Sequence, residues 1–183
     1  LFEAGVKYVE VSGRGGTSWS KVEYARGGRL PGFEEWGYPT VPAIAEAVMN
    51  SPADETAERE NATPFDASRV IASGGIRNGI DVAKGIALGA KMGGAALPFF
   101  KAENVAEEAN RWKEQLRTAM FLCGARTLGQ MSQAPVLVTN KSAEIMRLRG
   151  IDPANYANRR IVTEEKKSLG GRRRGADEPT HYL

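Results

Sequence analysis

The chain has 183 residues, of which 42% are hydrophobic and 26% are charged. This composition is typical of a globular protein with its own hydrophobic core, and it excludes disorder over most of the length. No run of residues approaches the ~20 apolar positions that a membrane-spanning helix needs. The single cysteine, Cys123, excludes an internal disulfide bond, and no cluster of Cys and His suggests zinc. We therefore expect a protein of the reducing cytoplasm.

The charge is small and is concentrated at one end of the chain. The net charge of +3 comes from 25 basic and 22 acidic residues. Residues 159–183 contain seven basic and four acidic residues, so residues 1–158 are neutral overall. Because the charge belongs to the end of the chain, nucleic acid is a weak candidate partner. We expect residues 1–158 to form the folded part and residues 159–183 to form a basic, disordered tail.

The chain opens with the signature of a turn followed by a strand. Residues 1–6 are typical of a helix end that is closed by Gly5. Neither Met nor a signal peptide precedes them, so we expect a segment of a longer protein. The β-prone residues 8–11 then lead into a loop at 12–17, SGRGGT, which is the first unit suited to ligand binding.

The next part of the chain combines an irregular stretch with a helix. Residues 20–38 are expected to be ordered but to hold little regular structure, with Phe33 and Trp36 as apolar anchors. Thr40 is predicted to be the N-cap of an amphipathic helix. Residues 51–68 are acidic and contain two prolines, which indicates a solvated loop.

Strands and helices alternate in the rest of the folded part. In chain order, we expect a strand at 70–72, a helix at 80–88, a buried strand at 93–97, and helices at 104–122 and 142–149. The inward residues expected in the long helix are Trp112, Leu116, Ala119 and Met120. Cys123 follows on the same apolar face, so we expect it to be a packing residue.

This alternation predicts an α/β fold with a parallel sheet, because parallel strands need crossover connections. About three β/α units can be counted, whereas a complete TIM (β/α)8 barrel has eight units and about 250 residues. In such folds the functional residues lie at the carboxyl ends of the strands.

Glycines follow the predicted strands at these carboxyl ends. Gly74 and Gly75 come directly after a strand, and Arg77 and the start of a helix add positive charge. Gly93 and Gly94 lie at the start of the next strand or in the turn before it. Glycine lets backbone amides approach an anion without obstruction. The two glycine pairs therefore indicate a phosphate-binding cradle.

Structural explanations for the same residues remain open. Glycines at strand ends are common in turns, and Arg77 could form a surface ion pair. Ser12 and Thr17 could bind a cofactor or only their own backbone. The only histidine, His181, lies in the predicted tail, which argues against a histidine base or a Ser-His-Asp triad.

Four sequence blocks resemble type 2 isopentenyl-diphosphate isomerases. The blocks are VSGRGGTSW at 11–19, WGYPT at 36–40, ASGGIRNGIDVAK at 72–84 and ALGA at 87–90. The first two are the most specific, because the glycine block of the third recurs in several flavin and nucleotide barrels. The resemblance covers residues 1–149. It implies a TIM barrel that interconverts isopentenyl and dimethylallyl diphosphate, and typically a homo-oligomer.

The resemblance also implies the cofactors and the residues that contact them. The family uses FMN in reduced form, NADPH as the reductant and Mg²⁺, and the reduced flavin itself handles proton exchange on the substrate. No catalytic residue is therefore expected in this chain. By position, Ser12 and Thr17 match FMN contacts. The residues that match the FMN phosphate site are Gly74, Gly75, Ile76, Arg77, Gly93 and Gly94.

The family residues that bind the diphosphate and the metal, and its other flavin contacts, would lie upstream of Leu1. The sequence therefore resembles the C-terminal part of the barrel, about three β/α units. Such a fragment would be inactive alone and would expose two strand edges that favour aggregation. Two alternatives stay open: another FMN-dependent TIM-barrel oxidoreductase, or an inactive half-barrel remnant.

Overall fold

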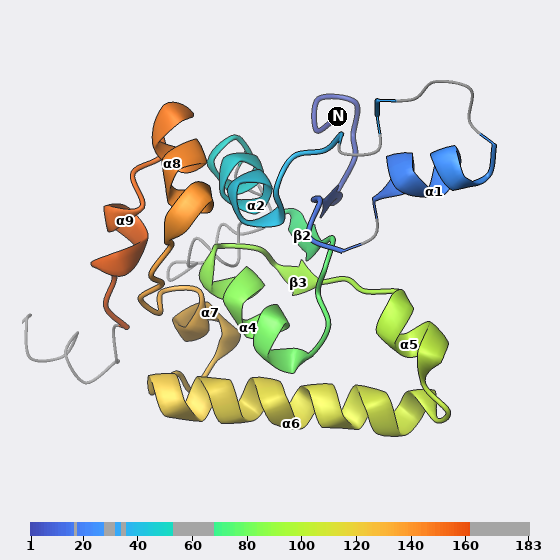
Figure 1. The fold of residues 1–183 in the computed structure, drawn as a ribbon. Helices are drawn as coiled ribbons and strands as arrows, with labels where there is room; N and C mark the ends of the chain where they lie inside the picture. Colours follow the sequence, from blue (N-terminus) through green and yellow to red (C-terminus); the bar gives the residue numbers. More distant parts are fainter. Residues whose placement is uncertain (17, 28–31, 34–35, 53–67, 162–183) are drawn as a thin grey trace, which may run out of the picture.

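A parallel three-stranded sheet lies at the centre of the fold (Figure 1). The computed structural model describes residues 1–16, 18–27, 32–33, 36–52 and 68–161. The strands are β1 (Val9–Ser12), β2 (Val70–Ser73) and β3 (Met92–Gly93), in the order β1-β2-β3. Both pairs are parallel, with Val9 opposite Val70 and Ile71 opposite Met92. The predicted α/β architecture with a parallel sheet is therefore confirmed.

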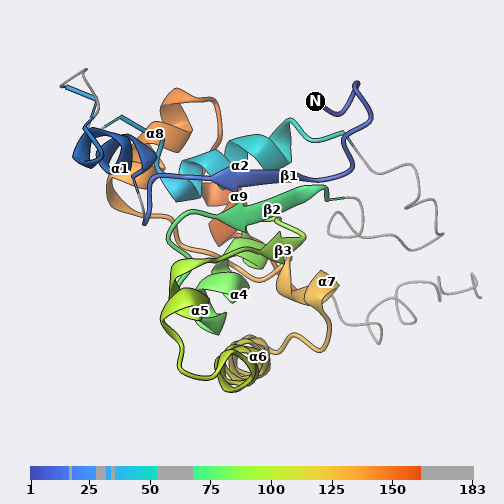
Figure 2. The same ribbon diagram turned by 90° about the vertical axis from the view of Figure 1, so that its right-hand side faces the viewer.

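Helices form the crossover connections and the outer layer. Those described are α1 (Trp19–Ala25), α2 (Thr40–Met49), α4 (Gly79–Ala87), α5 (Leu97–Lys101), α6 (Val105–Cys123), α7 (Leu128–Met131), α8 (Asn140–Leu148) and α9 (Ala154–Ala157). In Figure 2 the strands lie in front of α2 and α4, which cover the same face of the sheet. None of the helices described is both long and apolar enough to cross a membrane.

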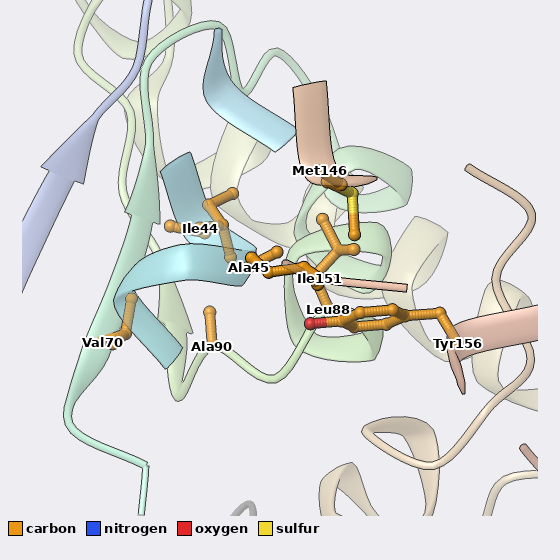
Figure 3. Packing of buried hydrophobic residues seen from close by; sticks show 9 residues of the cluster. Ile44, Ala45, Val70, Leu88, Ala90, Met146, Ile151 and Tyr156 are labelled. Carbon is orange, nitrogen blue, oxygen red and sulfur yellow. The ribbon is translucent and has the colours of Figure 1, made fainter. Parts of the chain in front are cut away.

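The main core lies between the sheet, α2 and the segment that carries α8 and α9. Val70 and Ala72 of β2 face this core, and Ile44 of α2 is 1% exposed. Figure 3 shows that Met146 and Tyr156 reach the same cluster from the C-terminal segment. The C-terminal segment is therefore part of the main core.

A second core lies between α4 and α6. Ala83 and Ile86 of α4 are buried, and Leu116 of α6 packs against them. The two helices approach closely because Gly79 has no side chain, and a Cβ at this position would overlap with the Trp112 carbonyl oxygen. The inward face predicted for the long helix is confirmed, since Trp112 is buried and Leu116, Ala119 and Met120 are half-buried.

The predicted strand at 93–97 is wrong in extent and in burial. Strand β3 ends at Gly93, both of its residues are exposed, and Leu97 begins α5. Pro98 lies in the first turn of this helix, where its fixed φ and missing N–H favour a helix start. Small residues fit either structure, so the proline is the stronger local signal.

The stretch at 20–38 differs from the prediction. Helix α1 begins at Trp19, and the Ser18 side chain caps it by accepting a hydrogen bond from the Lys21 amide. The supposed anchors Phe33 and Trp36 are 48% and 71% exposed, although their rings lie 5.5 Å apart. They contact one another but do not belong to either core cluster.

Two other single-residue predictions are wrong, and one helix starts earlier than expected. Cys123 is exposed, because it is the last residue of α6 and no described element covers it. Pro39, not Thr40, occupies the N-cap position of α2. Helix α8 begins at Asn140 rather than at residue 142. Residues 53–67 of the predicted acidic loop (51–68) and residues 162–183 of the predicted tail (159–183) lie outside the described residues.

Charged side chains attach the C-terminal segment to the body of the fold. Arg149, which follows α8, makes a two-point ion pair with Glu46 of α2, with Nε 3.2 Å from Oε2 and Nη2 bonded to Oε1. Arg159 donates hydrogen bonds to the carbonyl oxygens of Ala87 and Ser132 and lies over the Tyr156 ring. These contacts cross long sequence separations and lock the segment onto α2 and α4.

Replacing Met146 by alanine should destabilise the fold far more than the same change at Leu148. Met146 is fully buried, whereas Leu148 on the same helix is 79% exposed. Deletion of the buried side chain leaves a cavity, so we expect a loss of ~2–5 kcal/mol, against at most ~0.5 kcal/mol at Leu148. Urea unfolding followed by circular dichroism measures both. Equal losses would show that α8 does not pack on the core as described.

The Glu46–Arg149 pair should make stability depend on pH. The hydrogen bond from Arg149 holds the pKa of the Glu46 carboxyl below its usual value. Such a carboxyl stabilises the fold above its unfolded pKa, and this stabilisation is lost as the pH falls through the folded pKa. Arg149→Met should therefore lower Tm near neutral pH, and the difference from the unsubstituted protein should shrink as the pH approaches about 3. Thermal scans across this range test it, and a constant difference would contradict it.

Candidate functional site

Two glycine-rich loops meet at the carboxyl end of the sheet. The first glycine loop, residues 13–16, follows β1, and the second glycine loop, residues 74–77, follows β2. Strands β1 and β2 are paired with Ser12 opposite Ser73, so both loops leave the sheet at the same level. The parallel register therefore brings together two segments that are about 60 residues apart in the sequence.

The two loops touch through their backbones. Gly74 and Gly75 have φ values of +85° and +94°, a region that side chains rarely adopt. A Cβ at Gly74 would overlap with the Gly13 carbonyl, and a Cβ at Gly75 would overlap with the Gly15 carbonyl. A Cβ at Gly16 would lie 2.9 Å from the Gly75 nitrogen. These glycines are therefore required by loop contact as well as by backbone conformation.

Hydrogen bonds fix the carbonyl groups of both loops. Thr40 Oγ1, at the start of α2, donates to the Gly74 carbonyl oxygen at 2.6 Å. Arg77 Nη2 donates to the Gly15 carbonyl oxygen at 3.0 Å. Below the loops, Ser73 Oγ donates to the Val11 carbonyl at 3.0 Å. Each loop is thus held by a side chain from another segment.

The second glycine loop presents backbone donors that the chain itself does not use. Among the described residues, the amides of Gly74, Gly75 and Ile76 donate no hydrogen bond to the chain. By contrast, the Arg77 amide donates to Asp81 Oδ2 at 3.1 Å, and the Gly79 amide donates to the Gln115 Oε1 at 2.8 Å. The loop itself therefore offers unused donors at three successive positions.

Arg77 is the sequence-predicted basic residue of this cradle. Its side chain is exposed, and the bond to Gly15 holds its guanidinium against the first glycine loop. A guanidinium has five N–H donors, so this one bond leaves donors for an anion. The structure thus brings Arg77 to both loops, which the sequence alone did not predict.

Of the other two candidates near the first glycine loop, the structure describes only Ser12. Ser12 is exposed at the end of β1, and its register partner Ser73 is buried. Thr17 lies outside the described residues. The FMN contacts predicted at Ser12 and Thr17 therefore stay predictions.

Gly93 and Gly94 are close to the second loop but supply fewer donors than the sequence suggested. The Gly94 amide donates to the Ala72 carbonyl at 2.8 Å, so it extends the sheet. A Cβ at Gly93 would lie 2.8 Å from Val82 Cγ2, which shows that its small size serves packing against α4. That Gly93 and Gly94 belong to an anion site stays a prediction, which rests on the position of β3 next to β2.

The described residues include no group of three or more His, Cys, Asp or Glu that could hold a metal ion. The one histidine of the sequence, His181, is outside the described part. The donor set at the loops is made of backbone amides and a guanidinium, which is the chemistry of an anion site.

Thr40 has a different role from the one that its sequence position predicts. Thr40 was predicted to cap its own helix, but its hydroxyl donates to Gly74 instead. The sequence offers one signal for this: Thr40 closes the block WGYPT at 36–40, and Pro39 already occupies the N-cap position.

Residues 1–138 match the protein family described as FMN-dependent dehydrogenase. This match covers well over half of the chain. The chain belongs to the FMN-dependent dehydrogenase family. A family defined by FMN, whose flavin carries a phosphate group, agrees with an anion site at the carboxyl end of a parallel sheet.

The chain is also similar to curated proteins named isopentenyl-diphosphate delta-isomerase. The protein from Methanothrix thermoacetophila is 39% identical over 175 residues, which cover 87% of this chain and 44% of the relative. The protein from Methanothermobacter thermautotrophicus is 40% identical over 167 residues, with the same coverage. The protein from Paracoccus zeaxanthinifaciens is 40% identical over 146 residues, covering 74% of this chain and 39% of the relative. The resemblance inferred from the sequence blocks is thereby confirmed, and the chain spans less than half the length of these relatives.

The second glycine loop of this FMN-dependent dehydrogenase family member fits a flavin phosphate. Three successive amides, those of Gly74, Gly75 and Ile76, have no acceptor within the described part of the chain. Arg77 adds a positive charge beside them. A doubly charged phosphate needs several donors of this kind at one place.

Replacing Gly75 by alanine should destabilise the protein more than replacing Gly150 by alanine. Both glycines have positive φ, +94° and +73°, so each alanine bears a conformational cost of ~1 kcal/mol. Only at Gly75 would the added Cβ collide with backbone, that of Gly15, whereas Gly150 has open space. The collision should cost a further ~1–3 kcal/mol. Thermal unfolding measures both variants, and equal Tm values would argue against the contact between the loops.

Proposed function

We propose that this chain forms the C-terminal part of a TIM barrel that interconverts isopentenyl diphosphate and dimethylallyl diphosphate with bound FMN. The names of the curated relatives support the reaction, and the family description supports the flavin. The three parallel strands and the coverage of 44% of the relatives support a partial barrel. The activity belongs to the whole protein, and this chain forms one part of it.

The observation that carries this proposal is the set of three amides without acceptors within the described residues, at Gly74, Gly75 and Ile76. They lie beside Arg77 at the carboxyl end of a parallel strand. In β/α barrels this end of the sheet carries the active site, and its last loops commonly hold phosphate.

Each candidate residue has a distinct role in the proposal. The amides of Gly74, Gly75 and Ile76 donate to the FMN phosphate, and Arg77 offsets part of its negative charge. Gly93 and Gly94, at the neighbouring strand end, form the other side of the phosphate site. Ser12 and Thr17, at the neighbouring strand end, contact the rest of the flavin. Bound FMN in its reduced form would supply the proton exchange on the substrate.

Further cofactors and properties belong to the same proposal. Mg²⁺ would be held, together with the substrate diphosphate, by parts of the whole protein outside this chain. NADPH would reduce the flavin. We also propose a homo-oligomer in the cytoplasm, the compartment that the single cysteine favours.

A second candidate is an FMN-dependent oxidoreductase, which the family description itself favours. The two reactions differ in electron balance, because an isomerisation leaves substrate and flavin with unchanged electron counts, whereas a dehydrogenation reduces the flavin. Oxidases of 2-hydroxy acids use a histidine base, and the one histidine of this sequence, His181, is outside the matched residues 1–138. The relatives' names favour the isomerase.

The native protein that carries this sequence should convert isopentenyl diphosphate when FMN, NADPH and Mg²⁺ are supplied. Proton exchange and product formation, followed by NMR, measure the reaction, and the NADPH consumed should not scale with product. Conversion that consumes one NADPH or one oxidant per product would favour the oxidoreductase. No conversion and no flavin binding would favour an inactive remnant.

The matched variants Arg77→Ala and Arg117→Ala test the phosphate site in the same protein. Both remove one positive charge, but Arg117 lies on the outer side of α6. Loss of a charged hydrogen bond to phosphate should reduce FMN affinity on the order of tenfold or more for Arg77→Ala. Arg117→Ala should bind FMN as the unsubstituted protein does. Unchanged FMN retention in Arg77→Ala would remove Arg77 from the site.

A further inference from the structure

The Thr40 hydroxyl makes a contact that its own helix does not require. Thr40 is the first residue of α2, but Pro39 holds the N-cap position and α2 has no side-chain cap. The hydroxyl instead donates to the Gly74 carbonyl oxygen at 2.6 Å, across a separation of 34 residues. The one O–H donor of Thr40 therefore binds the second glycine loop.

This contact fixes the direction of a neighbouring donor. The Gly74 carbonyl and the Gly75 N–H belong to one planar trans peptide, so they point in opposite directions. When Thr40 holds the Gly74 oxygen, the Gly75 N–H must point away from Thr40. The Gly75 amide is one of the donors without an acceptor among the described residues.

A peptide between two glycines needs such a restraint. With Gly74 and Gly75 on either side, the peptide can rotate as a unit without the steric barrier that side chains impose. A rotation of about 180° would exchange the N–H for the carbonyl oxygen, which would repel an anion. The bond from Thr40 favours one of these two orientations, and it polarises the same peptide so that its N–H is a better donor.

We propose that Thr40 is a positioning residue for anion binding, acting through the Gly74 carbonyl to aim the Gly75 amide at a phosphate. The inference rests on the proposed function, in which that anion is the FMN phosphate. Arg77 holds the Gly15 carbonyl in the same manner, so the peptide of Gly15 and Gly16 is restrained from the opposite loop. Thr40 does not touch the phosphate in this scheme.

Thr40 also has a packing role that the test must separate from positioning. A Cβ at Gly13 would overlap with the Thr40 Cα, so the Thr40 backbone fills the space between the loops. A change in packing alone would affect every flavin that binds there. A change in the aim of one amide would affect only a ligand that carries the phosphate.

The experiment compares FMN with riboflavin, which has the same ring system and ribityl chain but no phosphate. The dissociation constants of both flavins are measured by quenching of flavin fluorescence. The proteins compared are the whole unsubstituted protein and its variants Thr40→Val, Thr40→Ala and Thr40→Ser. Valine keeps the shape without the hydroxyl, and serine keeps the hydroxyl. Thr139→Val, on an exposed threonine at the start of α8 that makes no capping bond, is the matched control. Circular dichroism and Tm verify that each variant is folded, and alanine replaces valine if the valine variant is not.

We expect Thr40→Val to weaken FMN binding on the order of tenfold, with riboflavin affinity changed by less than about threefold. Thr40→Ser should restore FMN affinity to within about threefold, and Thr139→Val should have no effect. Unchanged FMN affinity in Thr40→Val would overturn the inference. Equal weakening of FMN and riboflavin, or no rescue by serine, would reduce Thr40 to a packing residue and also overturn it.

The same data separate this inference from the proposed function. If the unsubstituted protein prefers FMN to riboflavin and Thr40→Val keeps the full preference, the phosphate site stands and only the role of Thr40 is rejected. If the unsubstituted protein binds both flavins equally, the phosphate site is rejected and the role of Thr40 falls with it.

Discussion

The carboxyl end of this sheet depends on contact between two stretches of bare backbone. The loops after β1 and β2 approach so closely that a Cβ on Gly15, Gly74 or Gly75 would overlap with the opposite loop. This proximity requires the parallel register in which Ser12 lies opposite Ser73. A shift of one strand by one residue would move its side chains to the other face of the sheet. It also requires Gly74 and Gly75 to adopt positive φ values. The strand register, the loop conformation and the presence of glycine thus depend on one another.

The same contact decides which backbone groups face outward. Inside the contact, carbonyl oxygens are held by Thr40 and Arg77, which come from different units of the fold. The amides on the other side of these peptides are left as donors at fixed positions. Donors that are already oriented need little reorganisation when a charge arrives, and this is the property that anion-binding loops exploit. An anion site can therefore arise here with a single exposed arginine and few other side chains.

The sequence predicted the elements whose signals are local and failed where a partner far along the chain decides. Helices α4 and α6 were found from their apolar periodicity, and β2 from a short apolar run before glycines. Residues 93–97 were misassigned because small residues fit a strand or a turn, and only Pro98 marks the helix. The glycines were identified as a ligand cradle, but their contact with one another depends on strand register. The bond from Thr40 crosses 34 residues and leaves no local pattern.

The C-terminal segment gives the fold a definite order of assembly. Helix α2 is completed early in the chain, yet the residues that cover it, among them Met146 and Tyr156, follow about a hundred positions later. Because synthesis proceeds from the N-terminus, the apolar face of α2 leaves the ribosome long before its cover does. During that interval Ile44 and its neighbours are exposed to other chains. Until α8 and α9 have been synthesised, the apolar face of α2 is therefore a site at which the nascent chain can aggregate.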